Sequence, residues 1–232
     1  MEKLVVLSGA GISAESGIST FRDKGGLWEE HDIMEVASPE GWERNQKLVQ
    51  RFYNERRRQL LDCEPNRAHK ALVELEKYFD VEIITQNIDD LHERAGSKKV
   101  THLHGELRKA QSTKYPDLVY EIEGWEIGDD DRCEKGFQLR PHVVWFGEPV
   151  PAMEAAIEIA SRADIFVVVG TSLNVYPAAG LLDYVPSGTP LYLIDPGEVQ
   201  YRGQSGINVI REKAGTGCAV LFEKLTRDQL PF

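Results

Sequence analysis

The sequence predicts an α/β protein in which a parallel β-sheet is covered by helices on both faces. Short apolar runs recur along the chain, segments with helical periodicity separate them, and the run IFVVVG at 165–170 is almost wholly apolar. Strands that alternate with helices are typical of a parallel sheet, and a strand buried on both faces has a continuous apolar sequence. The length of 232 residues suits one large domain, or one domain with a smaller lobe.

The predicted strands are six short apolar runs, at 3–8, 81–85, 100–103, 165–170, 191–195 and 207–210. Apolar residues repeat every three or four positions in 67–79 and 152–163, which predicts helices there. Two stretches break this rhythm: residues 21–60 have a largely helical pattern, and residues 106–141 are polar and irregular. Both are candidate insertions that form a smaller lobe.

Composition and charge exclude several classes of partner. The net charge of −11 argues against non-specific binding to nucleic acid or to an anionic membrane, so an anionic ligand must be held by local positive groups. No stretch approaches 18 apolar residues, and the first apolar run is too short for a signal peptide. The cysteines, Cys63, Cys133 and Cys218, form no CxxC pair, so we expect no disulfide framework, no thiolate zinc site and a cytoplasmic location.

The first strand leads into a glycine-rich turn, GAGISAESGISTFR at 9–22. Gly9 and Gly11 would let the backbone turn sharply and approach a phosphate, and a helix starting near Ser13 would direct its N–H groups at the anion. The next glycine, Gly17, follows Gly11 by six residues rather than the three of the ordinary dinucleotide fingerprint. A turn without a ligand therefore remains an alternative.

Two later strands also end in residues suited to ligand binding. Gly170, Thr171 and Ser172 follow the most apolar strand, at the edge where open α/β sheets bind ligands. Asp195 ends a further strand, where its carboxylate could accept hydrogen bonds from ribose hydroxyls or could simply form a turn.

Five segments together resemble the sirtuin family in order and spacing. They are GAGISAESGISTFR (9–22), TQNIDDLHERAG (85–96), HLHGEL (102–107), RPHVVWFGE (140–148) and GTSLNVYPAA (170–179). The resemblance implies a Rossmann-like large domain, about 1–20, 61–105 and 142–232, with an inserted small domain, about 21–60 and 106–141. It also implies NAD-dependent removal of acyl groups from lysines of proteins or peptides, yielding nicotinamide and 2′-O-acyl-ADP-ribose.

The resemblance identifies His104 as the catalytic histidine. A general base must remove a proton from a ribose hydroxyl, and histidine suits this role because its unperturbed pKa of about 6.5 lies near working pH. His102 is interpreted as structural, although an H-x-H pair could bind a metal. The NAD-binding residues that the resemblance implies are Gly9, Ala10, Gly11, Ile12, Ser13, Phe21, Arg22, Gln86, Asn87, Ile88, Asp89, Gly170, Thr171, Ser172, Asp195 and Ala214.

Some of these residues have more specific implied roles. Asn87 and Asp89 match positions that hold the nicotinamide and its ribose, with a polar turn as the alternative. Phe21 and Arg22 match the pair that covers the nicotinamide and supports the phosphates. A further segment resembles the part of sirtuins whose backbone pairs with an extended substrate peptide. The apolar side chains of this segment could equally belong to the core. The segment consists of Val144, Trp145 and Phe146.

A helical face within 49–60 bears on the acyl group. Tyr53 and Arg56 lie three residues apart and therefore point the same way, together with Val49, Phe52 and Leu60. The simplest interpretation is an amphipathic helix with a solvated basic patch, because Arg51, Arg57 and Arg58 are nearby. However, the Tyr-x-x-Arg spacing resembles the signature of the class III, or desuccinylase, branch, in which this pair binds the distal carboxylate of a succinyl or malonyl group. Ala37 matches that branch's small residue, which leaves room for a longer acyl chain.

Two departures from the family pattern are visible. Most sirtuins hold the small domain together with four cysteines around zinc, whereas residues 106–140 contain only Cys133, so we expect no zinc. A hairpin turning at Gly124 could supply a miniature core in its place, from Leu118, Tyr120, Ile122, Trp125 and Ile127 together with Tyr115 and Phe137. Asp195 replaces the usual asparagine at a ribose-contacting position.

Three alternatives to deacylation remain. An NAD-dependent ADP-ribosyltransferase would share the cleavage of NAD but transfer ADP-ribose to a protein. A non-catalytic NAD-binding module would not need His104, Asn87 or Asp89. A conventional dehydrogenase is the weakest alternative, because the glycine spacing does not match.

Overall fold

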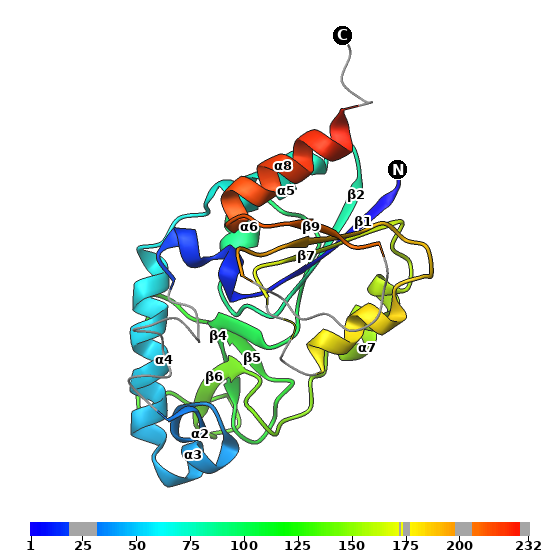
Figure 1. Cartoon of the computed structure of the whole chain (residues 1–232). Coiled ribbons are helices and arrows are strands. Elements are labelled where there is room, and N and C mark those ends of the chain that lie inside the picture. Colours follow the sequence, from blue (N-terminus) through cyan, green and yellow to red (C-terminus); the bar gives the residue numbers. More distant parts are fainter. Residues whose placement is uncertain (19–31, 172, 174–176, 198–205, 228–232) are drawn as a thin grey trace.

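The main sheet of the protein has six parallel strands in the order β3-β2-β1-β7-β8-β9 (Figure 1). The computed structural model describes residues 1–18, 32–171, 173, 177–197 and 206–227. The strands are β1 (Lys3–Ser8), β2 (Asp80–Thr85), β3 (Val100–His102), β7 (Ile165–Val169), β8 (Leu191–Ile194) and β9 (Asn208–Ile210). These are the six predicted strands, so the prediction of a parallel α/β sheet is confirmed.

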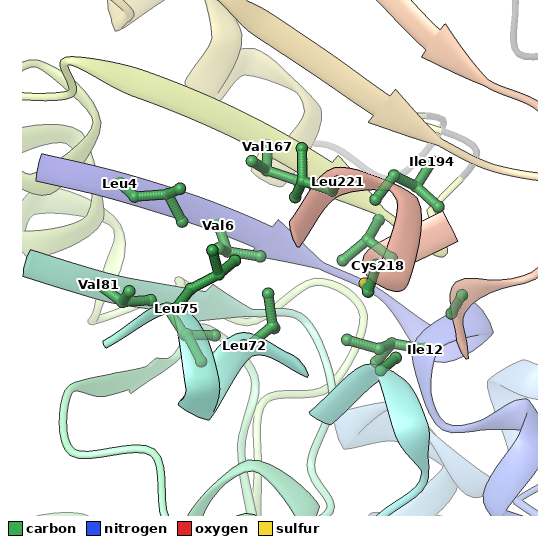
Figure 2. Close-up of a cluster of buried hydrophobic side chains, with 14 of the residues drawn as sticks. Leu4, Val6, Ile12, Leu72, Leu75, Val81, Val167, Ile194, Cys218 and Leu221 are labelled. Carbon is green, nitrogen blue, oxygen red and sulfur yellow. The ribbon is translucent and has the colours of Figure 1, made fainter. Parts of the chain in front are cut away.

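Helices cover both faces of this sheet, as predicted. Helices α5 (Arg67–Leu75) and α8 (Ala214–Thr226) pack on one face, and α7 (Met153–Ala160) with the 3-10 helix η3 (Ala178–Tyr184) packs on the other. Side chains of β1 alternate between the two cores, because successive strand residues point to opposite faces. Figure 2 shows the first core, where Leu4 and Val6 of β1 lie near Leu72, Leu75, Cys218 and Leu221. Full burial of each large apolar side chain contributes about 1.5–3 kcal/mol.

The order of the strands determines where a ligand can bind. The chain moves outward from β1 through β2 to β3 on one side, then resumes on the other side of β1 with β7. The sheet therefore has a switch point between β1 and β7, where the connections diverge and leave a crevice at the carboxyl ends of the strands.

A second, smaller sheet is antiparallel, with the order β5-β4-β6. Its strands are β4 (Gly105–Ser112), β5 (Val119–Glu121) and β6 (Leu139–Val143), and the nearby helices are α2 (Ile33–Val36), α3 (Pro39–Arg44) and α4 (Gln46–Leu61). Helix α4 contacts both β4 and β6, so the two predicted insertions lie together. Side-chain oxygens cap the helices: Ser38 accepts from Gly41 N before α3, and Asn45 accepts from Leu48 N before α4.

The predicted hairpin at Gly124 is wrong. Strand β5 pairs with β4, in the register Ala110↔Tyr120, and Trp125 and Ile127 lie in no strand. A small apolar cluster does form, from Ala110, Ile122 and Ile127 with Leu139 packed against it. Tyr115 and Phe137 instead contact each other, with ring centroids 5.5 Å apart.

The solvated basic patch on α4 is also wrong for one of its members. Arg51 and Arg58 are exposed, but Arg57 is fully buried. Its Nε donates to the Leu107 carbonyl oxygen at 2.6 Å, and its Nη1 donates to Asn54 Oδ1 at 2.7 Å and to the Trp125 carbonyl oxygen at 2.8 Å. Oxygen atoms of the small lobe thus accept from Nε and Nη1, whereas the buried Nη2 has no hydrogen-bond partner among the described residues.

Candidate active site

A large cavity of about 1110 Å³ lies at the carboxyl ends of the main strands. Its wall contains residues that directly follow four neighbouring strands: Gly9 after β1, Gln86 after β2, Gly170 after β7 and Asp195 after β8. Parallel strands bring these four turns to one edge of the sheet. The cavity is therefore at the switch point, where α/β sheets bind nucleotides.

The glycine-rich turn differs from the expectation. No α-helix starts at Ser13; two short 3-10 helices, Ala10–Ile12 and Ala14–Ser16, follow β1 instead. The N–H groups of Gly9, Gly11 and Ile12 donate to carbonyl oxygens of Val169, Gly170 and Gly9, so they are not available to an anion. A Cβ atom on Gly11 would lie 2.7 Å from the Gly170 Cα. These glycines therefore allow two strand-following turns to pack against each other.

A chain of hydrogen bonds connects this turn with the loop after β2. Asn87 Nδ2 donates to Ser13 Oγ at 3.1 Å, and Ser13 Oγ donates to Asp89 Oδ2 at 2.9 Å. All three residues are buried, and burial raises the pKa of the Asp89 carboxyl, opposed by hydrogen bonds from Leu91 N and Ser13. Nearby, Gln86 Nε2 donates to Thr171 Oγ1 at 3.1 Å. The loop at 86–89 is thus fixed against both glycine turns.

His104 lies where the chain passes from the large sheet to the small one, between β3 and β4. It lines the cavity, and its Nδ1 is 2.9 Å from the Gln86 carbonyl oxygen. Burial lowers the pKa of His104, partly offset by this hydrogen bond. The ring is therefore held as a neutral imidazole, the form that acts as a general base.

The other histidines of this region are structural in their contacts. His102 does not line the cavity; it contacts the Asn87 carbonyl oxygen and the Glu93 carboxylate, each at 2.9 Å. His92 Nε2 is 3.0 Å from Ser8 Oγ, and its ring lies edge-on to the ring of His69 at 4.9 Å. Within the described part of the chain, no group of three or more His, Cys, Asp or Glu side chains is placed to hold a metal ion.

The far side of the cavity involves residues that sequence reasoning missed. Asp195 and Ala214 both line it, as expected, and Asp195 Oδ1 also accepts from Gly197 N at 2.8 Å, as a turn former does. Glu15 lines it as well, and its Oε2 accepts from Gly215 N at the start of α8 at 2.7 Å. Lys213 also lines the cavity and adds a cation to its wall. The Glu15 contact spans 200 residues of sequence, which no local pattern could reveal.

The small-lobe end of the cavity carries the residues expected to contact the acyl group. Ala37, Tyr53 and Arg56 all line it. Tyr53 is buried, and the Arg56 guanidinium lies over the Phe52 ring at 4.8 Å from its centroid. The face of α4 that bears Tyr53 and Arg56 therefore lines the cavity.

The segment expected to pair with a substrate peptide is already engaged within the chain. Val144 N donates to the His104 carbonyl oxygen and Phe146 N to the Ala37 carbonyl oxygen, each at 2.9 Å, and Trp145 N donates to Glu148 Oε2 at 2.8 Å. All three residues line the cavity, although Trp145 is also part of the buried core. The Trp145 carbonyl oxygen is engaged as well, because it accepts from Glu148 N at 3.0 Å.

Four of the predicted NAD-binding residues are not among the described residues that line the cavity. Ile12 packs in the core and does not line the cavity. Phe21, Arg22 and Ser172 lie outside the described residues. Among the described residues of the cavity wall, the positive groups are Arg56 and Lys213, and the carboxylates are those of Glu15, Asp89, Glu148 and Asp195. No helix in the described ranges is long and apolar enough to cross a membrane.

Fold and site together define an α/β protein with a nucleotide-type binding cavity between its two sheets. The Sir2 family model matches residues 9–177. A protein from Bacteroides thetaiotaomicron named "NAD-dependent protein deacylase" is 54% identical, with 97% of this chain and 98% of that protein covered. A solved Sir2 homolog–NAD complex superposes with a TM-score of 0.89 at 40% identity, covering 98% of this chain and 91% of the other. Another, titled "Sir2 bound to acetylated peptide", has a TM-score of 0.81 at 31% identity, with 95% and 92% covered.

The chain belongs to the Sir2 family. The resemblance of its five sequence motifs to sirtuins is thereby confirmed.

Proposed function

We propose that this chain is an NAD-dependent protein-lysine deacylase that removes succinyl and malonyl groups as well as acetyl groups. One observation carries the proposal: a single cavity brings together a neutral histidine, a fixed polar loop and a Tyr–Arg pair. These are His104, the loop at 86–89, and Tyr53 with Arg56. Family membership and the names of the relatives support the deacylase activity, whereas the range of acyl groups rests on the Tyr–Arg pair.

The fit to NAD rests on the turns around the cavity. Four strand ends converge there, and the hydrogen-bond chain from Asn87 through Ser13 to Asp89 fixes polar groups in its wall. NAD would supply a ribose whose bond to nicotinamide breaks as the carbonyl oxygen of the acyl-lysine bonds to C1′ in its place. His104 then takes a proton from a ribose hydroxyl at Nε2, because Nδ1 is occupied by the Gln86 carbonyl oxygen. One water is consumed in releasing the lysine, and the expected products are nicotinamide, 2′-O-acyl-ADP-ribose and the free lysine.

The Tyr–Arg pair supports the recognition of an acidic acyl group. The protein has a net charge of −11, so an anionic substrate needs a local cation. Arg56 supplies one at the small-lobe end of the cavity, and its planar guanidinium can bind both oxygens of a carboxylate. Ala37 lines the same cavity with only a methyl group, which leaves room for a longer acyl chain.

The test is an assay with succinyl-, malonyl- and acetyl-lysine peptides, with and without NAD. Arg56→Met should lower kcat/KM for the succinyl peptide by roughly 10- to 100-fold and affect the acetyl peptide little, because a hydrogen bond to a charged group contributes roughly 1.5–3 kcal/mol. Arg51→Met, an exposed arginine of the same helix, is the matched control. Equal losses on both peptides would show that Arg56 supports the helix rather than the acyl group.

The same assay separates deacylation from ADP-ribosyl transfer. Mass spectrometry should find the acyl group on ADP-ribose and an unmodified lysine. ADP-ribose attached to the peptide or protein would instead favour the transferase alternative. Binding of NAD without formation of any product would favour a non-catalytic binding module.

A further inference from the structure

Trp145 is held in place from three sides. Its backbone N donates to Glu148 Oε2 at 2.8 Å, and the Arg140 guanidinium lies over its ring, 3.8 Å from the centroid. The ring of Trp42 contacts it at a centroid distance of 5.7 Å. Only 2% of Trp145 is exposed, so its indole has one well-defined position.

An ion pair underlies this arrangement. Arg140 Nη1 donates to Glu148 Oε1 at 2.8 Å, and Arg140 Nη2 donates to Glu148 Oε2 at 2.9 Å. This two-pronged geometry is the strong form of an arginine–carboxylate pair, and both side chains are largely shielded from water. Glu148 thus fixes the Trp145 backbone while Arg140 fixes its ring.

The indole in turn contacts the residue expected to recognise the acyl group. Trp145 Nε1 donates to the Tyr53 hydroxyl oxygen at 3.1 Å. An indole N–H is only a donor, so the phenol oxygen must accept. Within the described residues this is the one hydrogen bond made by that hydroxyl, which leaves its proton to be donated elsewhere. Burial also raises the pKa of Tyr53, so the hydroxyl keeps that proton.

We infer that Trp145, held by Arg140 and Glu148, is a positioning residue for acyl specificity: it orients the Tyr53 hydroxyl as a donor toward the distal carboxylate of an acidic acyl group. This inference rests on the proposed function. A succinyl or malonyl group offers a carboxylate acceptor to Tyr53 and a counter-ion to Arg56. An acetyl group offers neither, so it gains nothing from the orientation of this hydroxyl.

Trp145→Phe tests this inference, because it keeps an aromatic ring and removes the five-membered ring of the indole together with its N–H; the Tyr53→Phe background below separates the lost hydrogen bond from the lost volume. The ratio of kcat/KM for succinyl over acetyl peptide should fall roughly 2- to 10-fold, the range for one neutral hydrogen bond. Tyr53→Phe should lower the same ratio. In the Tyr53→Phe background, Trp145→Phe should not lower it further, because the hydroxyl through which Trp145 acts is gone.

Several outcomes would overturn the inference, and they differ from a failure of the proposed function. A Trp145→Phe effect that is equal on both peptides, or that persists without the Tyr53 hydroxyl, would make Trp145 a packing residue only. In that case the Arg56→Met result would still stand. If the wild-type protein does not remove succinyl groups at all, both proposals fail. Should Trp145→Phe fold poorly, Glu148→Gln is the second variant, because it weakens the contacts that hold Trp145 in place. The ratio of kcat/KM for succinyl over acetyl peptide should again fall, and only when the Tyr53 hydroxyl is present.

Discussion

His104 donates its Nδ1 proton to the backbone carbonyl oxygen of Gln86 across 2.9 Å, which leaves Nε2 as the basic atom of the ring. A carbonyl oxygen can only accept, so this contact selects one tautomer. The partner is backbone, so the selection survives substitution of the Gln86 side chain. The His104 imidazole is therefore oriented by the turn after β2 and not by a second titrating group.

The tautomer and burial of His104 predict the acid limb of the pH profile. Burial lowers the pKa of His104 below its ordinary value of about 6.5. In the proposed mechanism the neutral ring is the active form, so activity should persist as the pH falls toward 6.5 and be lost only below it. A profile of kcat/KM between about pH 5 and 9 measures this. An acid limb centred above pH 6.5 would contradict the assignment.

Removing the imidazole should abolish turnover with little effect on the binding of NAD. His104→Ala should lower the rate of deacylation by about 10²–10⁴, the typical contribution of a general base. Calorimetry should find an NAD dissociation constant close to that of the wild-type protein. Near-normal turnover by the folded variant would exclude His104 as the base.

The hydrogen-bond chain through Ser13 predicts a loss of NAD affinity. Ser13→Ala removes both the acceptor of Asn87 Nδ2 and the donor to Asp89 Oδ2, and it leaves the buried Asp89 carboxylate with one fewer partner. We expect the dissociation constant for NAD to rise roughly 10-fold, because a hydrogen bond to a charged group is involved. Ser161→Ala, at an exposed serine at the end of α7, is the control. An affinity equal to that of the control would mean that the loop holds its shape without Ser13.

The main sheet could be predicted from the sequence, whereas the small sheet could not. Strands buried on both faces are continuous apolar runs, and β7 is an example because all five of its residues are buried. Strand β4 has the sequence GELRKAQS and only three buried residues, so it resembles a polar loop. Missing β4 left β5 without its true partner, which led to the wrong hairpin at Gly124.

Long-range polar contacts limited what could be predicted of the site. The turns after β1, β2, β7 and β8 were visible because each follows an apolar run. The burial of Arg57 could not be predicted, because its acceptors include backbone carbonyl oxygens, which have no sequence signature. The same holds for Trp145 and Tyr53, whose contact joins residues 92 positions apart.

Two buried histidines predict that the fold is sensitive to acid. Burial lowers the pKa of His69 to about 4, and it lowers that of His92 well below the ordinary value. The unfolded chain binds protons near pH 6.5, so it gains protons that the folded state refuses between about pH 6.5 and 4. The contribution of these histidines to the free energy of unfolding should therefore have its full value above pH 6.5 and decrease as the pH drops toward 4. His69 alone contributes on the order of 3 kcal/mol to this fall, because a tenfold change in protonation corresponds to about 1.4 kcal/mol.

His69→Gln separates this effect from acid titration of carboxylates. His69 Nδ1 accepts from Asn66 N at the start of α5, and glutamine at this position can keep such a capping contact without titrating. Urea unfolding at pH 7.5, 6.0 and 5.0 should show a smaller loss of stability for the variant than for the wild-type protein. Parallel pH dependences would indicate that His69 is not protonated on unfolding in this range.

The buried side chains of α4 predict how the small lobe is held together. Gln50, Asn54 and Arg57 lie on one face of the helix, and each bonds the backbone of the lobe. Gln50 Nε2 donates to the Leu139 carbonyl oxygen, and Asn54 exchanges two hydrogen bonds with Ile127, all at 3.0 Å. These contacts join α4 to β4, β6 and the loop between β5 and β6. A structural zinc would make the same kind of connection between separate segments of chain.

We therefore predict that the protein folds and works without zinc, and that Arg57 supplies part of the missing stability. Burial lowers the pKa of Arg57 to about 10, so the guanidinium is still charged at pH 7. Arg57→Met should reduce the free energy of unfolding by about 3 kcal/mol, because buried carbonyl oxygens lose a charged donor. Arg51→Met, exposed on the same helix, should change it by less than about 0.5 kcal/mol. Elemental analysis of protein purified without added metal should find no stoichiometric zinc, and a chelator should leave both Tm and activity unaltered. Stoichiometric zinc, or a collapse of Tm on chelation, would mean that a metal holds the lobe and that the contacts of Arg57 are secondary.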